Sequence, residues 1–152
     1  MKLFIVVIII FFDQLTKSIV ANNIQLNSKY ELTSFLDIIY IQNPGILFGF
    51  FSNVLSPWFI LTIVGLVIII LFIWLLKSQD SYERWGIILI ISGALGNFID
   101  RFIHNHVTDF IYFHYHKYYW PAFNIADIFI TFGVVILIIA TYMSYKYKVN
   151  IR

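Results

Sequence analysis

Four long runs of apolar residues constrain the fold of this chain more than any other feature of its sequence. A helix that crosses a membrane needs about 20 mainly apolar residues. Hydrophobic residues make up 61% of the 152 residues and charged residues only 12%, which is more apolar surface than a soluble core of this size can bury. We therefore predict a single-domain all-α membrane protein, residues 1–152, with transmembrane helices at residues 3–20, 58–76, 85–102 and 124–145.

The basic residues predict how these helices are oriented. An even number of spans places both termini on one side, and most of the lysines and arginines then share that side. They are Lys2, Lys77, Arg84, Lys146, Lys148 and Arg152. Because basic residues next to spans favour the cytoplasm, we predict cytoplasmic termini and outer connections at residues 22–57 and 103–123. The net charge of +2 follows from this topology and gives no reason to expect a nucleic-acid partner.

The first outer connection changes character along its length. Its segment ELTSFLDIIYIQ is rich in β-forming residues, which predicts a small extracytoplasmic β-sheet. The sequence NPGILFGF follows at residues 43–50, where Pro44 and Gly45 indicate a turn. Gly45 and Gly49 would let the backbone approach a neighbour closely. An ordinary connection back to the second span is also compatible with this segment.

Charged residues interrupt the first span. Asp13, Thr16 and Lys17 have i, i+3, i+4 spacing and therefore lie on one face of a helix. Charged side chains within a bilayer must face a protein interior or a wet cavity, and Asp13 and Lys17 can pair within their helix. We favour a structural pair that attaches this helix to the others over a catalytic role.

The outer end of the third span combines small and polar residues. Ser92 and Gly96 form a small-xxx-small pair that allows a neighbouring helix to come close. Asn97, Asp100 and Arg101 follow on broadly one face. One interpretation is a packing seam closed by a buried Asp100–Arg101 pair. In that case Asn97 and Arg101 still have hydrogen-bond donors to offer a ligand.

The second outer connection contains all four histidines, as His104 with His106 and His114 with His116. Two His-x-His pairs could indicate zinc, since residues i and i+2 of a strand point the same way. No nearby helix carries a His/Glu ligand motif, and the aromatic residues at 110–120 are typical of a segment at the membrane interface. We therefore predict an interfacial outer loop and no metal or other cofactor.

Asp109 lies within this connection, and Asp127 lies just after its junction with the last span. Asn124 is well placed as an N-cap, with Asp127 three residues later, so capping could explain both residues. Capping alone does not explain why polar groups of the first, third and fourth spans gather at one outer depth. We predict that Asp109 and Asp127 meet there, hold one proton between them and activate a water against a peptide bond.

Two other interpretations remain open at this stage. A small transporter could use Asp13, Asp100, Asp109 and Asp127 as a proton or cation relay, since ionisable groups in membranes also mark ion paths. Transporters commonly show internal repeats and midplane sites, and we find no matching halves and polar groups only toward one side. A non-catalytic scaffold whose charges are packing pairs is the third interpretation.

Five blocks of sequence resemble one known family. They are DQLTK at 13–17, NPGILFG at 43–49, GALGNFIDR at 93–101, VTDF at 107–110 and FNIAD at 123–127. In these blocks the chain resembles the bacterial lipoprotein signal peptidases, also called signal peptidase II. The departures, such as Pro44 and Leu47, concern substrate preference more than chemistry.

The resemblance implies an aspartic endopeptidase of the bacterial inner (plasma) membrane, with its site near the outer leaflet. Such an enzyme removes the signal peptide of a diacylglyceryl-modified prolipoprotein just before the lipidated cysteine, and we expect membrane lipids and this substrate as partners of a monomer. The resemblance assigns the roles as follows: catalysis to Asp109 and Asp127, substrate contacts to Asn43, Gly45, Asn97, Arg101 and Asn124, and structural support to Asp13, Lys17 and Asp100.

Overall fold

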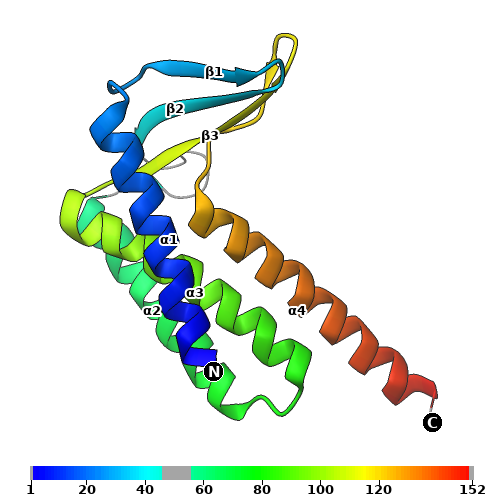
Figure 1. Cartoon of the computed structure of the whole chain (residues 1–152). Coiled ribbons are helices and arrows are strands. Elements are labelled where there is room, and N and C mark those ends of the chain that lie inside the picture. Colours follow the sequence, from blue (N-terminus) through cyan, green and yellow to red (C-terminus); the bar gives the residue numbers. More distant parts are fainter. Residues whose placement is uncertain (1, 46–55, 151–152) are drawn as a thin grey trace.

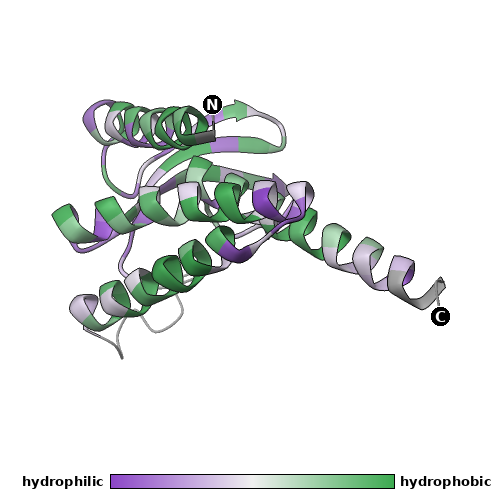
Figure 2. Cartoon of the chain, turned by 90° about the horizontal axis from the view of Figure 1, so that it is seen from below, coloured by the Kyte–Doolittle hydropathy of each residue, from purple (hydrophilic) through white to green (hydrophobic). Residues whose placement is uncertain are grey.

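Four helices lie beneath a small antiparallel sheet in the computed structural model, which describes residues 2–45 and 56–150 (Figure 1). The helices are α1 (Lys2–Asn23), α2 (Pro57–Lys77), α3 (Ser81–His104) and α4 (Ile125–Asn150). Each contains a segment that is long and apolar enough to cross a membrane, and apolar residues cover most of the helical surface (Figure 2). The predicted four-span architecture is confirmed.

Helix α3 is central and packs against the three other helices. The glycines of α3 explain how closely α1 and α4 approach it. A Cβ atom at Gly86 would lie 2.9 Å from the carbonyl oxygen of Gly133 in α4, and one at Gly96 would lie 2.6 Å from Asp13 Oδ2 in α1. The close approach predicted from the small residues is therefore found at Gly96, whereas Ser92 donates to the carbonyl of Ile88 within α3.

The sheet has the strand order β1-β2-β3-β4. Its strands are β1 (Lys29–Thr33), β2 (Leu36–Asn43), β3 (Val107–Tyr115) and β4 (Tyr118–Tyr119). The first outer connection forms β1 and β2, as predicted. The structure extends that prediction, because the second outer connection supplies β3 and β4. Strand β3 is rich in β-branched and aromatic residues, and its pairing with β2 satisfies backbone groups that a loop would leave open.

Helix α4 leaves the bundle in its second half (Figure 1). It crosses α3 where Gly133 meets Gly86 and then leans away from the other helices. As a result, only 11% of the most apolar window of α4 is buried within the protein, against 67% in α3. The N-terminal end of α4 lies under the sheet, whereas its C-terminal half has few protein neighbours.

Candidate active site

Asp109 and Asp127 lie on either side of Asn124, where the sheet meets the helices. Asp109 is on β3 and Asp127 is in the first turn of α4. Asn124 Nδ2 donates to Asp109 Oδ1 at 2.7 Å, and the Asn124 backbone N–H donates to Asp127 Oδ2 at 3.2 Å. One residue therefore contacts both carboxylates, which come from segments that the sequence separates by eighteen positions.

The predicted cap of α4 is present. Asn124 Oδ1 accepts a hydrogen bond from the Asp127 backbone N–H at 3.0 Å, and the Asp127 carboxylate in turn accepts one from the Asn124 backbone N–H. These reciprocal bonds form a capping box. The capping box leaves the side-chain NH2 group of Asn124 unused, and this group is the one that donates to Asp109. Capping is therefore only part of what Asn124 does.

The turn after β2 contributes a second donor to Asp109. Asn43 Nδ2 donates to Asp109 Oδ2 at 2.9 Å, and Asn43 Oδ1 accepts from the Gly45 N–H at 3.0 Å. The Gly45 carbonyl in turn accepts from Arg101 at 2.7 Å. Gly45 thus makes close backbone contacts, as predicted. Gly49 lies outside the described residues.

Three asparagines are oriented in the same way around the two carboxylates. In each of them an N–H donor holds the side-chain oxygen, so that the NH2 group points at an aspartate. For Asn97 the donor is Lys17 Nζ at 2.9 Å, and Asn97 Nδ2 donates to Asp127 Oδ1 at 2.8 Å. All four carboxylate oxygens of Asp109 and Asp127 consequently accept an N–H. Such donors stabilise the ionised form of a carboxyl group.

Burial opposes this effect at Asp109, which is only 3% exposed. Loss of water and, secondarily, the negative charge of Asp127 raise the pKa of Asp109 to about 6, although the hydrogen bonds from Asn43 and Asn124 act to lower it. Because Asp127 contributes to this shift, the two carboxyl groups interact electrostatically. Carboxyl groups that interact strongly titrate as a pair rather than one by one.

Lys17 forms the centre of a buried ionic cluster between α1 and α3. Its ammonium group lies 2.8 Å from Asp13 Oδ2, 2.9 Å from Asp100 Oδ2 and 2.9 Å from Asn97 Oδ1. Asp13 Oδ1 also accepts from the Ala126 N–H in the first turn of α4 at 2.8 Å. The predicted Asp13–Lys17 pair is confirmed, and it links three helices directly beside Asp127.

The predicted pairing of Asp100 with Arg101 is wrong. Among the described residues Asp100 forms its ion pair with Lys17. Successive residues of a helix point about 100° apart, so Asp100 faces α1 while Arg101 faces the turn after β2. Gln14 was missed by the sequence reasoning. It donates to Asp100 Oδ1 at 2.8 Å, and its position three residues before Lys17 was the available signal.

Arg101 is a buried cation beside the carboxylates. It donates to the carbonyls of Gly45 and Asn97, at 2.7 and 3.2 Å. It also interacts electrostatically with Asp127 and Asp109. Its Nε atom is buried and has no hydrogen-bond partner among the described residues. Arg101 therefore holds the turn after β2 in place, and its Nε–H group remains available as a hydrogen-bond donor.

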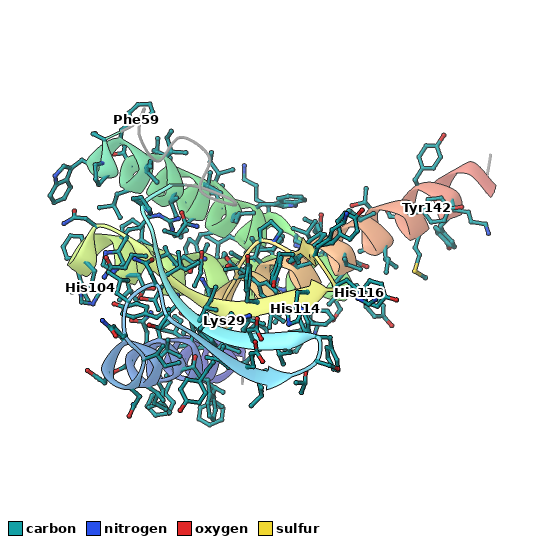
Figure 3. The ribbon with its side chains drawn as sticks, turned by 90° about the horizontal axis from the view of Figure 1, so that it is seen from above. Lys29, Phe59, His104, His114, His116 and Tyr142 are labelled. Carbon is teal, nitrogen blue, oxygen red and sulfur yellow. The ribbon has the colours of Figure 1, made fainter. Side chains whose placement is uncertain are left out.

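The histidines do not converge on a metal site. Figure 3 shows His104 well away from His114 and His116, which lie toward the opposite end of the sheet. His114 lies 3.3 Å from the buried carboxylate of Asp37, which also pairs with Lys29 at 3.3 Å. Among the residues that the structure describes, no three His, Cys, Asp or Glu side chains are placed to hold a metal ion. The zinc interpretation therefore has no structural support.

Sequence comparisons identify one family, and solved bacterial membrane enzymes share the fold. The family described as signal peptidase (SPase) II matches residues 5–143. A lipoprotein signal peptidase of Bartonella tribocorum is 41% identical over 145 residues, covering 91% of this chain and 86% of the relative. A lipoprotein signal peptidase of Pelagibacter ubique is 36% identical, covering 99% of this chain and 92% of the relative. A bacterial membrane enzyme solved by the in meso method at 1.9 Å resolution is 34% identical, with a TM-score of 0.82 over 92% of this chain and 91% of its own.

Proposed function

The chain belongs to the signal peptidase II family, and on that premise we propose that it is an intramembrane aspartic endopeptidase with Asp109 and Asp127 as its catalytic pair. It is a protease and a multi-pass bacterial membrane protein. Its substrate is a prolipoprotein whose cysteine carries a diacylglyceryl group, and the bond that it cuts precedes this cysteine.

The shared contact of Asp109 and Asp127 with Asn124 carries this proposal. Two interacting carboxyl groups do not both ionise easily, so the pair holds a single proton near neutral pH. The ionised member takes a proton from a water as this water attacks the scissile carbonyl, and the protonated member donates to the carbonyl oxygen. No covalent intermediate is needed.

The neighbouring residues support substrate binding and the developing charge. The Nε donor of Arg101, which has no partner among the described residues, stabilises negative charge on the carbonyl oxygen or holds the substrate backbone extended. Asn43, Asn97 and Asn124 orient the carboxylates, and Asp13, Lys17 and Asp100 fix the helices that carry them. We propose that one chain carries out the reaction as a monomer and without a cofactor.

We further propose that the pair lies near the outer leaflet and that both termini are cytoplasmic. Lys77 is the last residue of α2 and Arg84 is in the first turn of α3, at the end of these helices remote from the sheet. The positive-inside rule places this end in the cytoplasm. The diacylglyceryl chains of the substrate then remain in the outer leaflet and help to localise it beside the pair.

Asn124→Ser tests the contact between Asn124 and Asp109 separately from the cap. Serine is also a favoured N-cap residue, so helix stability should change by only about 1 kcal/mol. The hydroxyl cannot replace the donor to Asp109, and kcat should fall about 10²-fold because the carboxylate is no longer held. Turnover of a lipidated prolipoprotein and thermal unfolding in detergent measure the two effects.

The matched control for that variant is Asn22→Ser. Asn22 is exposed and its amide donates to Ser18 within α1, so both measurements should remain at the wild-type level. An unchanged kcat in Asn124→Ser would show that the contact with Asp109 has no catalytic importance.

The raised pKa of Asp109 predicts a pH-dependent stability. An unfolded chain releases this proton near the ordinary value of 3.8, whereas the folded chain keeps it until about pH 6. Between these values the folded state binds more protons than the unfolded state. The stability that the Asp109 carboxyl group contributes is therefore fully present at low pH and is lost as the pH rises through 6. Roughly two pKa units correspond to about 3 kcal/mol.

Equilibrium unfolding of wild type and Asp109→Asn at pH 4 to 7 measures this effect. The free energy of unfolding of the wild type, relative to the variant, should decline by about 2 kcal/mol between pH 4 and pH 6 and level off by about pH 7. A difference that does not change with pH would contradict a buried Asp109 coupled to Asp127.

A further inference from the structure

A groove lies beside the second half of α4, the part of this helix that leans away from the bundle (Figure 1). Its volume is about 480 Å³, which is within the usual range for ligand sites. The groove is lined by Trp74 of α2 and by Leu137, Ile138, Thr141, Tyr142 and Tyr145 of α4. Ile138 is 63% exposed and Tyr142 64%, so the groove faces sideways into the bilayer.

The groove lies on the same face of α4 as Asp127. Eleven residues separate Asp127 from Ile138, which is three turns of helix plus about 20°. Thr131 and Val134 lie between them on this face, and both are exposed. The Thr131 hydroxyl donates to the Asp127 carbonyl, so its polar group is satisfied within the helix. An exposed, mainly apolar path thus runs from the catalytic pair to the groove.

The end of the groove remote from Asp127 is acidic. A second cavity of about 250 Å³ shares Thr141 and Tyr145 with the groove and is also lined by Asp80 and Glu83. Among the described residues neither carboxylate forms an ion pair with a lysine or arginine. The nearby Arg84 instead donates to the Ser78 carbonyl at 3.1 Å. The cavity therefore offers negative charge to a cationic group.

We propose that the signal peptide of the substrate lies along this face of α4, with its apolar segment in the groove and its basic N-terminal region beside Asp80 and Glu83. This inference rests on the proposed function. Signal peptides carry a positively charged region, then 7–15 apolar residues, then the cleavage site. The same order of chemistry runs along α4 from the acidic cavity through Ile138 to Asp127.

The dimensions of α4 fit this placement. From Asp127 to Ser144, which lines the acidic cavity, α4 rises about 26 Å at 1.5 Å per residue. A helical apolar segment of 15 residues spans about 22 Å. A short segment around the cleavage site and a basic residue before the helix account for the difference. The basic region therefore reaches Asp80 and Glu83 when the scissile bond is at the pair.

Disulfide trapping tests the position of the signal peptide. The chain has no cysteine, so Ile138→Cys introduces a single thiol into the groove. Met143→Cys is the matched control, because Met143 is 58% exposed but lies about 160° around the helix from Asp127. Both are placed in an Asp127→Asn background, which keeps a lipidated prolipoprotein intact. The prolipoprotein carries a second cysteine in the middle of its apolar segment.

We expect the substrate to be trapped by Ile138→Cys at least about tenfold more efficiently than by Met143→Cys. Equal trapping at the two positions would overturn the inference. Trapping and cleavage are measured separately, so the two proposals can fail separately. If the wild-type chain cleaves the substrate but trapping is equal at the two positions, the proposed function stands and this docking site does not. If trapping favours Ile138→Cys but the wild-type chain does not cleave, the docking site stands and the proposed function does not.

The acidic cavity is tested by Asp80→Asn combined with Glu83→Gln. Asparagine remains a good N-cap for α3, where Asp80 accepts from the Glu83 N–H. KM for a substrate with a Lys- and Arg-containing N-terminal region should rise about fivefold relative to KM for the same substrate with glutamines there. An unchanged ratio of the two KM values would show that the basic region lies elsewhere.

Discussion

Asp109→Asn and Asp127→Asn should each lower kcat on the order of 10⁴-fold while the protein remains folded. An amide has no basic oxygen that can take a proton from the attacking water, and it cannot supply an acidic proton to the scissile carbonyl. The replacement has nearly the same size and retains one oxygen that can accept an N–H. The loss should therefore fall on turnover and far less on folding.

Asp37→Asn is the matched control for this experiment. Asp37 is a fully buried carboxylate on β2, the strand that pairs with β3, and it contacts Lys29 and His114 rather than Asp109. The same chemical change there should weaken the sheet and leave kcat within about tenfold of wild type. Single-turnover cleavage of a lipidated prolipoprotein, corrected for the folded fraction, measures all three variants.

The scaffold interpretation predicts a different result. If the charges only pack the helices, residual activity in Asp109→Asn and Asp127→Asn will follow the amount of folded protein, as it does in Asp37→Asn. Normal turnover by either variant would remove the pair from the mechanism. A transporter would show no cleavage by any of the four proteins.

The helices could be predicted from the sequence because apolar runs of about 20 residues are typical of membrane-spanning helices. The second outer connection was harder, because its aromatic residues are typical of both a membrane interface and a strand. Its pairing partner is far away in the sequence: Ile41 lies opposite Asp109 in the β2–β3 register. A local pattern carries no information on such a partner, so β3 was expected as a loop.

The sequence could predict at which depth in the membrane the site residues lie, but not which of them contact each other. The sequence placed Asn97, Asp109 and Asp127 toward one side of the membrane, and the structure brings them together. It did not indicate that Lys17 holds the oxygen of Asn97, or that Asp100 faces Lys17. These contacts depend on how each helix is rotated about its axis and on which way an amide points. Packing decides both, and the spacing of residues along one helix does not.

Lys17→Met should destabilise the protein by about 3–5 kcal/mol, the usual result of removing one partner from a buried ionic cluster. Asp13 is fully buried and Asp100 is 4% exposed, and Lys17 is the ion-pair partner of both among the described residues. Methionine fills a similar volume, so the loss reflects two carboxylates left without their cation rather than a cavity. Thermal or chemical unfolding in detergent measures it.

Two comparisons separate this effect from ordinary loss of charge. Lys29→Met removes a lysine that also pairs with two carboxylates, at 3.3 Å each, but its side chain is 40% exposed, so its loss should be much smaller. Adding Asp100→Asn to Lys17→Met removes one of the stranded charges. The double variant should be more stable than the sum of the single effects by at least about 1 kcal/mol.

The Lys17→Met variant should lose more activity than the decrease in its folded fraction explains. Among the described residues Lys17 is the donor that fixes the side-chain oxygen of Asn97, so without it the amide can rotate and present that oxygen to Asp127 Oδ1 in place of its NH2 group. Two acceptors then face each other and the carboxylate moves from its working position. If Lys17→Met instead loses stability and turnover in equal proportion, Lys17 supports the helices only, and Asn97 keeps its orientation by other contacts.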